Sequence, residues 1–169
     1  SLIEFRRFQG ALKNSNLVDS SDILTKMRQI KDESEINIIR QIIGMTDQAF
    51  SHILKIIQPG MTEQELSLEL ELSLRKMGAS DRSFDYIVAS GLRSSLPHGV
   101  ASKKKISNGE LLTFDFGGKY KGYCSDLTRT VSLGQQDAKQ KEIYNIVLEA
   151  QQAGIDAIKP GLSGQEVDA

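Results

Sequence analysis

The sequence predicts an α+β fold in which helices flank a central run of antiparallel strands. Apolar residues recur at helical spacing in 1–14, 32–58, 62–77 and 137–159, and Pro-Gly, Gly or Asn-rich breaks end these segments. Residues 84–133 are strand-like instead, and they contain tight-turn glycines. The order of these two patterns predicts helices packed on a sheet.

The composition is that of one ordinary globular domain, with 169 residues of which 39% are hydrophobic. A net charge of −1 gives no field that would favour nucleic acid or an anionic membrane as a partner. No apolar run approaches the ~18 residues of a membrane span, and the first residues lack the apolar stretch of a signal peptide. The single cysteine, Cys124, cannot form an internal disulfide, which predicts a cytoplasmic location and a small buried side chain.

The first two helices are predicted from their ends and their apolar stripes. Asn14–Asn16 stops the first helix, and Leu17–Asp19 is predicted to be a short strand or linker. Asp32 begins the long second helix, where it can form a capping box with Glu35. The expected apolar stripe of this second helix comprises Ile36, Ile39, Ile43, Phe50, Ile53 and Ile57.

The remaining helices carry similar signals. Thr62 and Glu65 form a second capping box, and Gly78 ends the helix that they begin. Its expected buried face comprises Leu66, Leu70, Leu74 and Met77. The last long helix is predicted to begin near Asp137 and to end at Pro160–Gly161.

The start of the third helix is repeated 101 residues further along the chain. Residues 57–66 and 158–167 each comprise a helix end, a Pro-Gly break and a capped helix start. Several similar or identical positions match in register, which favours an internal duplication over chance. The second copy has only begun at Ala169, so the sequence is expected to be cut within a two-unit domain.

Three strand segments are expected at 84–90, 111–117 and 123–133. The loop between the first two contains a Pro-His-Gly sequence at 97–99 and the basic run Lys103–Lys105. Because short charge runs are usually solvated, the lysines are predicted to form an exposed turn.

Two aspartates are the candidate functional residues of the strand region. A hairpin centred on Tyr120 and Lys121 would place Asp115 directly opposite Asp126. Residues opposite on one face have Cβ atoms about 4.5–5.5 Å apart, and like charges there repel. A pair of divalent metal ions that shares both carboxylates would relieve this repulsion. A hairpin end that faces solvent is the alternative; a kinase-type Asp-Phe-Gly is excluded because the chain lacks the accompanying kinase motifs.

Four motifs then follow one another in a recognisable order. They are Ser83–Gly91, Pro97–Gly99, Gly109–Gly117 and Gly122–Thr130. In combination they closely resemble the pita-bread metallopeptidases, specifically the Xaa-Pro aminopeptidase and Xaa-Pro dipeptidase (prolidase) branch. The resemblance covers about 32–169. It implies the first half of a pita-bread fold, with an antiparallel hairpin that carries the metal aspartates and helices on the outer face.

The resemblance also implies a set of functional residues. The family's dinuclear metal site has two Asp, one His and two Glu ligands; Asp115 and Asp126 match the two Asp, and the others are expected beyond Ala169. His98 matches a histidine that helps to stabilise the tetrahedral intermediate, and Phe84 falls where the family places a substrate-pocket aromatic. The two divalent ions are expected to be Mn, Co, Zn or Fe, all of which accept such ligands, with Mn favoured.

The implied activity is that of a metallo-exopeptidase that hydrolyses the bond before proline by means of a metal-bridging hydroxide, with this truncated chain inactive alone. Residues 1–30 are expected to be the tail of a preceding N-terminal domain and linker, and 31–169 the N-terminal half of the catalytic domain. The expected partners are a short proline-containing peptide and, in the complete protein, a second copy.

Two alternatives stay open. One is a non-catalytic pita-bread binding module. The other is a relative of methionine aminopeptidase or creatinase. The segment 1–30 counts against methionine aminopeptidase, which generally lacks such an extension, and the paired aspartates count against creatinase, which does not use the dinuclear site.

Overall fold

The structure, a computed structural model, describes residues 1–168. The chain divides into two compact units, Ser1–Asn37 and Ile38–Ala169. Among the described residues, no helix combines the length and apolar composition that crossing a membrane requires.

The first unit contains helices α1 (Leu2–Ala11) and α2 (Ser21–Gln29). Helix α1 confirms the first predicted helix, and the predicted linker at Leu17–Asp19 has neither helix nor strand structure. Helix α2, between this linker and Asp32, is not among the predicted elements. Asp19 accepts a hydrogen bond from the backbone N–H of Ser21 at 2.8 Å. This local contact at the start of α2 is one that apolar spacing does not reveal.

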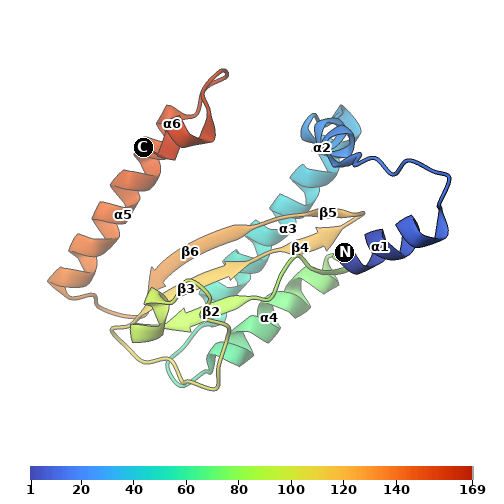
Figure 1. Ribbon diagram of the computed structural model, residues 1–169. Helices are drawn as coiled ribbons and strands as arrows, with labels where there is room; N and C mark the ends of the chain where they lie inside the picture. The colour runs from blue at the N-terminus through green and yellow to red at the C-terminus, as the bar shows by residue number, and fades with distance from the viewer. Residues whose placement is uncertain (169) are drawn as a thin grey trace. The chain divides into compact units, whose positions relative to one another are not determined.

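The second unit packs two helices on one face of an antiparallel sheet (Figure 1). These are α3 (Glu33–Ile56) and α4 (Glu63–Lys76). The sheet has the order β2-β3-β6, with bounds Ile87–Ser90, Leu111–Phe116 and Leu127–Ser132. A smaller sheet has the order β1-β4-β5, with bounds Asp81–Arg82, Gly118–Tyr120 and Tyr123–Cys124.

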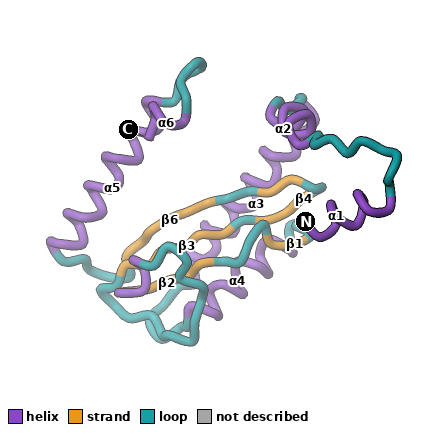
Figure 2. Tube along the Cα trace, in the orientation of Figure 1, coloured by secondary structure: helices purple, strands orange, loops and turns teal. Residues whose placement is uncertain are grey.

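The remaining elements of this unit are helical, and Figure 2 shows them along the trace. They are the 3₁₀ helix η1 (Gly91–Ser95), α5 (Ala138–Ala157) and α6 (Gly164–Asp168). Asp137 caps α5 in a capping box with Gln140, and the Gln140 side chain donates to the carbonyl of Gly109 at 2.7 Å. None of the α5 residues is buried, and its apolar side chains, such as Ile146 and Val147, stay exposed.

The core lies between the two packed helices and the sheet. Its fully buried hydrophobic residues on the helices are Ile42, Ala49, Ile53, Leu66, Leu70 and Leu74. From the sheet side, Phe114 and Phe116 meet the ring of Phe50 at centroid distances of 5.9 and 6.4 Å. Burial of each such large side chain contributes about 1.5–3 kcal/mol. Ile43, which the predicted stripe of α3 includes, is 47% exposed, because the helix buries Ile42 and Thr46 instead.

Strand β3 separates the core from a second, more open face. Leu112, Phe114 and Phe116 are buried against the helices, while Thr113 and Asp115 alternate with them and are only half-buried. Because successive strand residues point to opposite faces, Asp115 is turned away from the core.

The hairpin that ends in β6 has a different register from the predicted one. Asp115 pairs with Thr128 rather than with Asp126, and Tyr120 pairs with Tyr123. The turn therefore centres on Lys121 and Gly122, whose φ angles are 48° and 87°. Type I′ hairpin turns need positive φ at both central residues, and Gly122 meets this need without strain.

A break in the second strand separates β5 from β6. Ser125 is buried there, with its Oγ 2.6 Å from Thr46 Oγ1 and 3.0 Å from the backbone nitrogen of Gly118. A Cβ atom on Gly117 would lie 1.9 Å from the Ser125 carbonyl oxygen, so only glycine permits this approach. The buried serine thus fixes the backbone next to Asp126, which lies between β5 and β6.

Two further predictions are wrong. Cys124 is exposed rather than buried, because it lies on the short edge strand β5 of the small sheet. Of the three lysines predicted to be solvated, Lys103 and Lys105 are exposed, but Lys104 is partly buried, with its Nζ 2.7 Å from Glu110 Oε1 and 2.8 Å from Ser90 Oγ.

The two copies of the internal repeat have the same local structure. Gly60 and Gly161 have φ angles of 93° and 95°. Thr62 and Ser163 then accept hydrogen bonds from the backbone N–H three residues on, at 3.1 and 3.3 Å. In return, Glu65 and Glu166 accept from the capping residues. The repeated Pro-Gly break and capping box therefore form the same helix start twice.

Candidate metal centre

Asp115 lies on the open face of the sheet, among threonines of the neighbouring strand. Thr128 Oγ1 donates to Asp115 Oδ1 at 3.0 Å, and the adjacent cross-strand pair, Thr113 and Thr130, has its hydroxyl oxygens 3.1 Å apart. Strand pairing places all four side chains on this one face. The face thus presents a polar stripe with a carboxylate in it.

Asp126, the residue just before β6, lies at the same site. Partial burial raises the pKa of its carboxyl, and the neighbouring charge of Asp115 and a side-chain hydrogen bond with Asp115 raise it further. The two carboxyls are therefore adjacent, although Asp126 is a diagonal neighbour of Asp115 and not its direct partner. Paired acids of this kind destabilise one another's charged form when no cation lies between them.

The donor chemistry of this pair fits a divalent metal ion. Hard divalent cations prefer carboxylate oxygens, and a cation would offset the negative charge of Asp115, which together with burial raises the Asp126 pKa. Within residues 1–168 no group of three or more His, Cys, Asp or Glu side chains is placed to hold a metal ion. The pair is thus a partial ligand set.

A depression of about 240 Å³ opens beside Asp115. The sheet lines it with Ile87, Thr113, Asp115 and Thr128, and the end of η1 and the loop after it line it with residues 94–97. Pro97 is the residue before His98, so the loop that carries His98 forms one wall of the space in front of Asp115.

His98 is exposed within that loop. Its carbonyl oxygen accepts a hydrogen bond from the Val100 N–H at 2.9 Å, and Val100 bridges to Ile87 of β2. The next residue, Gly99, is buried against the sheet, and a Cβ atom there would lie 2.9 Å from Ala89 Cβ. The loop backbone around His98 is therefore closely packed on β2.

Phe84, the predicted substrate-pocket aromatic, packs on a neighbouring ring. Its half-buried ring packs edge-on against Tyr86 at 6.4 Å, and Tyr86 in turn packs against Phe116 of the core. The structure thus brings Asp115 and Asp126 together, holds the His98 loop beside Asp115, and packs Phe84 on Tyr86. The threonine neighbours of Asp115 were missed in the sequence because the predicted register put Asp126 in the place of Thr128.

A helix-covered antiparallel sheet with paired aspartates on its open face, preceded by the Pro-His-Gly loop, defines a metallopeptidase of the pita-bread class. Residues 37–169 match the model of metallopeptidase family M24. The chain belongs to this family.

Individual relatives agree with this assignment. The chain is 48% identical to a protein of Bacillus subtilis named uncharacterized peptidase YqhT, over 98% of this chain and 47% of that protein. Among solved structures, an Xaa-Pro dipeptidase from Bacillus anthracis matches with a TM-score of 0.95 and 51% identity, over 100% of this chain and 47% of the other. An X-Pro aminopeptidase from Thermotoga maritima matches with a TM-score of 0.94 and 42% identity, over 99% and 47%. The chain spans about half the length of these relatives.

Proposed function

We propose that this chain forms the N-terminal half of the catalytic domain of a dinuclear metal-dependent exopeptidase that hydrolyses the peptide bond before proline. The observation that carries the proposal is the adjacent pair Asp115 and Asp126, placed on the open face beside a depression. The names of two similar solved structures, Xaa-Pro dipeptidase and X-Pro aminopeptidase, support the substrate class.

Each proposed residue has a chemical task. Asp115 and Asp126 would hold two divalent ions, with the His and Glu ligands supplied by sequence that follows residue 169. The ions, when bound, would supply Lewis-acid activation of water and of the scissile carbonyl. His98 would donate a hydrogen bond to the negative charge that develops on the substrate, and Thr128 orients the Asp115 carboxylate through its 3.0 Å hydrogen bond. Phe84 would contact the substrate at the edge of its pocket.

The proposal has further parts. Manganese is the favoured metal, the substrate is a short proline-containing peptide, and the complete enzyme is a cytoplasmic homodimer. In this proposal residues 1–30 are the tail of a preceding domain with its linker.

The test is a hydrolysis assay on the complete enzyme with Mn²⁺. Substrates are Ala-Pro, a longer Xaa-Pro peptide and the same peptides with alanine in place of proline. We expect proline-dependent turnover that Asp126→Asn abolishes and that the control Asp47→Asn, an exposed aspartate on α3, leaves unchanged. Equal turnover of the alanine peptides would reject the substrate class, and absence of turnover on all of them would favour a binding module.

His98 is tested in the same assay. Because its proposed hydrogen bond forms with charge that develops in the transition state, His98→Ala should lower kcat about a hundredfold or more. The metal content, measured by elemental analysis, should stay unchanged. Loss of metal on this substitution would make His98 a ligand and overturn its proposed role.

A further inference from the structure

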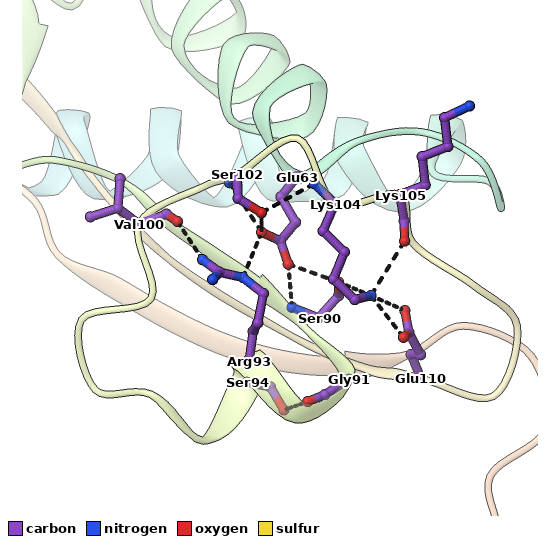
Figure 3. A network of polar contacts seen from close by, with 10 residues as sticks. All are labelled: Glu63, Ser90, Gly91, Arg93, Ser94, Val100, Ser102, Lys104, Lys105 and Glu110. Carbon is purple, nitrogen blue, oxygen red and sulfur yellow. Dashed lines mark hydrogen bonds and ion pairs between the residues drawn. The ribbon is translucent and has the colours of Figure 1, made fainter.

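Glu63, the first residue of α4, is a fully buried carboxylate at 0% exposure. It is the centre of a polar network that joins the helix to the end of β2, to η1 and to the following loop (Figure 3). A buried charge is costly unless hydrogen bonds and opposite charges compensate it. The arrangement of its partners therefore indicates what the carboxylate holds.

Five hydrogen bonds converge on the two oxygens of Glu63. Oε1 accepts from the Ser90 N–H and hydroxyl, both at 2.8 Å. Oε2 accepts from the Ser102 N–H at 3.0 Å, from the Ser102 hydroxyl at 2.6 Å and from Arg93 Nε at 3.1 Å. Burial by itself would raise the pKa of Glu63, but the hydrogen bonds from Ser102 and Ser90 outweigh it and hold the pKa below its usual value. The carboxylate is thus ionised at neutral pH.

These partners are the two ends and one interior point of a single loop. Ser90 precedes the segment 91–101, Ser102 follows it, and Arg93 lies within it. The Arg93 guanidinium also donates to the carbonyl of Val100 at 2.8 Å, which ties the start of the segment to its end. His98 lies between these two tied residues. One carboxylate therefore closes the loop that contains His98.

The start of the helix does not explain Glu63. The capping boxes of Thr62 with Glu65 and of Ser163 with Glu166 have the same hydrogen bonds, yet the position that matches Glu63 in the second copy is Gly164. A glycine there still permits a capped helix start. The Glu63 carboxylate is accordingly an addition to the repeated unit, and its contacts lie in the loop.

We infer that Glu63 is a positioning residue, whose carboxylate fixes the 91–101 loop so that His98 is held beside the Asp115 and Asp126 site. This inference rests on the proposed function, because it assigns a purpose to the His98 geometry. The loop end is independently anchored, since Gln64 N–H donates to the Ser102 carbonyl at 3.0 Å. Loss of the carboxylate would remove the acceptor that Ser90, Arg93 and Ser102 share, so 91–101 should loosen, while the Gln64 bond holds the Ser102 backbone and the sheet stays intact.

The first experiment measures order in the loop by amide hydrogen exchange on the 169-residue chain. The reporters are the N–H groups of Leu96, Gly99 and Val100, which donate to carbonyls inside the loop and not to Glu63 itself. We expect Glu63→Gln to accelerate their exchange about tenfold or more while the amides of β3 keep their protection, since an amide replaces an acceptor of charge-assisted bonds.

Glu65→Gln is the matched control, because it removes the same charge from the same helical turn but leaves a side chain that can still cap Thr62. It should leave the loop unchanged. If Glu63→Gln does not fold, Ser102→Ala removes one hydroxyl donor and should accelerate the same amides to a smaller extent. Unchanged loop exchange in the variant that folds, or a change of equal size in β3, would overturn the inference.

The second experiment is a double-mutant cycle on the complete enzyme. If Glu63 acts through His98, Glu63→Gln should lower kcat at least tenfold with KM little changed, and it should have almost no further effect in the His98→Ala background. If the two substitutions lower kcat independently, so that the double variant shows the product of the two single effects, the positioning role of Glu63 is overturned while the proposed role of His98 stands. A His98→Ala variant with unchanged kcat would instead refute the proposed function of His98, and the positioning role would fall with it.

Discussion

Replacing Gly117 by alanine should damage the candidate metal centre through the backbone. An added Cβ would lie 1.9 Å from the Ser125 carbonyl oxygen and 2.5 Å from Ser83 Oγ. The Ser83 hydroxyl can rotate away. The Ser125 carbonyl cannot move as easily, because the Ser125 side chain is hydrogen-bonded to Thr46 and Gly118. Relief of the clash therefore requires the Ser125–Asp126 backbone to move.

The cost can be compared with that of the same change at the next residue. Overpacking costs about 1–3 kcal/mol, and loss of the Ser125 hydrogen bonds to Thr46 and Gly118 adds about 1 kcal/mol each, so Gly117→Ala should cost about 3–5 kcal/mol in total. At Gly118 the closest atom to an added Cβ is the flexible side-chain end Ile42 Cδ1, at 2.9 Å. Gly118→Ala should thus cost about 1 kcal/mol.

The assay is urea unfolding of both variants followed by circular dichroism, with the slope m checked for constancy. We expect Gly117→Ala to be less stable than Gly118→Ala by about 2 kcal/mol or more, a large fraction of the ~5–15 kcal/mol that stabilises a typical domain. Equal stabilities of the two variants would show that the Ser125 backbone yields without cost and would refute the reasoning.

Three further predictions concern charge. In the metal-free chain at pH 7, Asp126→Asn should stabilise the fold by about 0.5 kcal/mol in urea unfolding, because it removes like-charge repulsion with Asp115; destabilisation would show that the carboxylates do not repel. Burial raises the pKa of Tyr86 to about 12. The contribution of the neutral Tyr86 side chain to the free energy of unfolding is therefore complete below pH ~10, the pKa of an unfolded tyrosine, and is lost as the pH rises to about 12. Tyr86→Phe should remove this loss of stability at alkaline pH, and a loss of the same size in the variant would contradict the prediction. Mn²⁺ should bind the 169-residue chain more weakly than micromolar, as titration calorimetry can show, because residues 1–168 hold no group of three potential ligands; tight binding of two ions would contradict this.

Local signals in the sequence were sufficient for most of the fold. The capping residues Asp32, Thr62 and Asp137 begin the three long helices as predicted, because a cap involves only neighbours in the chain. The phase of a long helix is less secure. Ile42 and Ile43 are equally apolar, and only contact with the sheet decides that Ile42 is buried.

The site was harder to predict than the fold, since it depends on register and on distant contacts. The adjacency of Asp115 and Asp126 was expected, but the turn chemistry at Gly122 shifts the pairing and puts Thr128 opposite Asp115. Lys104 could not be placed from its neighbours, because its partners are Ser90 at the end of β2 and Glu110 just before β3. The only sign of Glu63 in the sequence is that the matching position of the repeat is Gly164. This difference indicates a role for Glu63 only once its hydrogen-bond network is known.

The most direct test of the metal centre is a crystal structure of the complete enzyme with Mn²⁺, with the ions located by their anomalous scattering. The account predicts two ions about 3.5–4 Å apart, with oxygen atoms of both Asp115 and Asp126 in their coordination shells, and loss of the ions in Asp126→Asn crystals. Ions bound elsewhere, or a fully occupied pair that persists in Asp126→Asn, would contradict it.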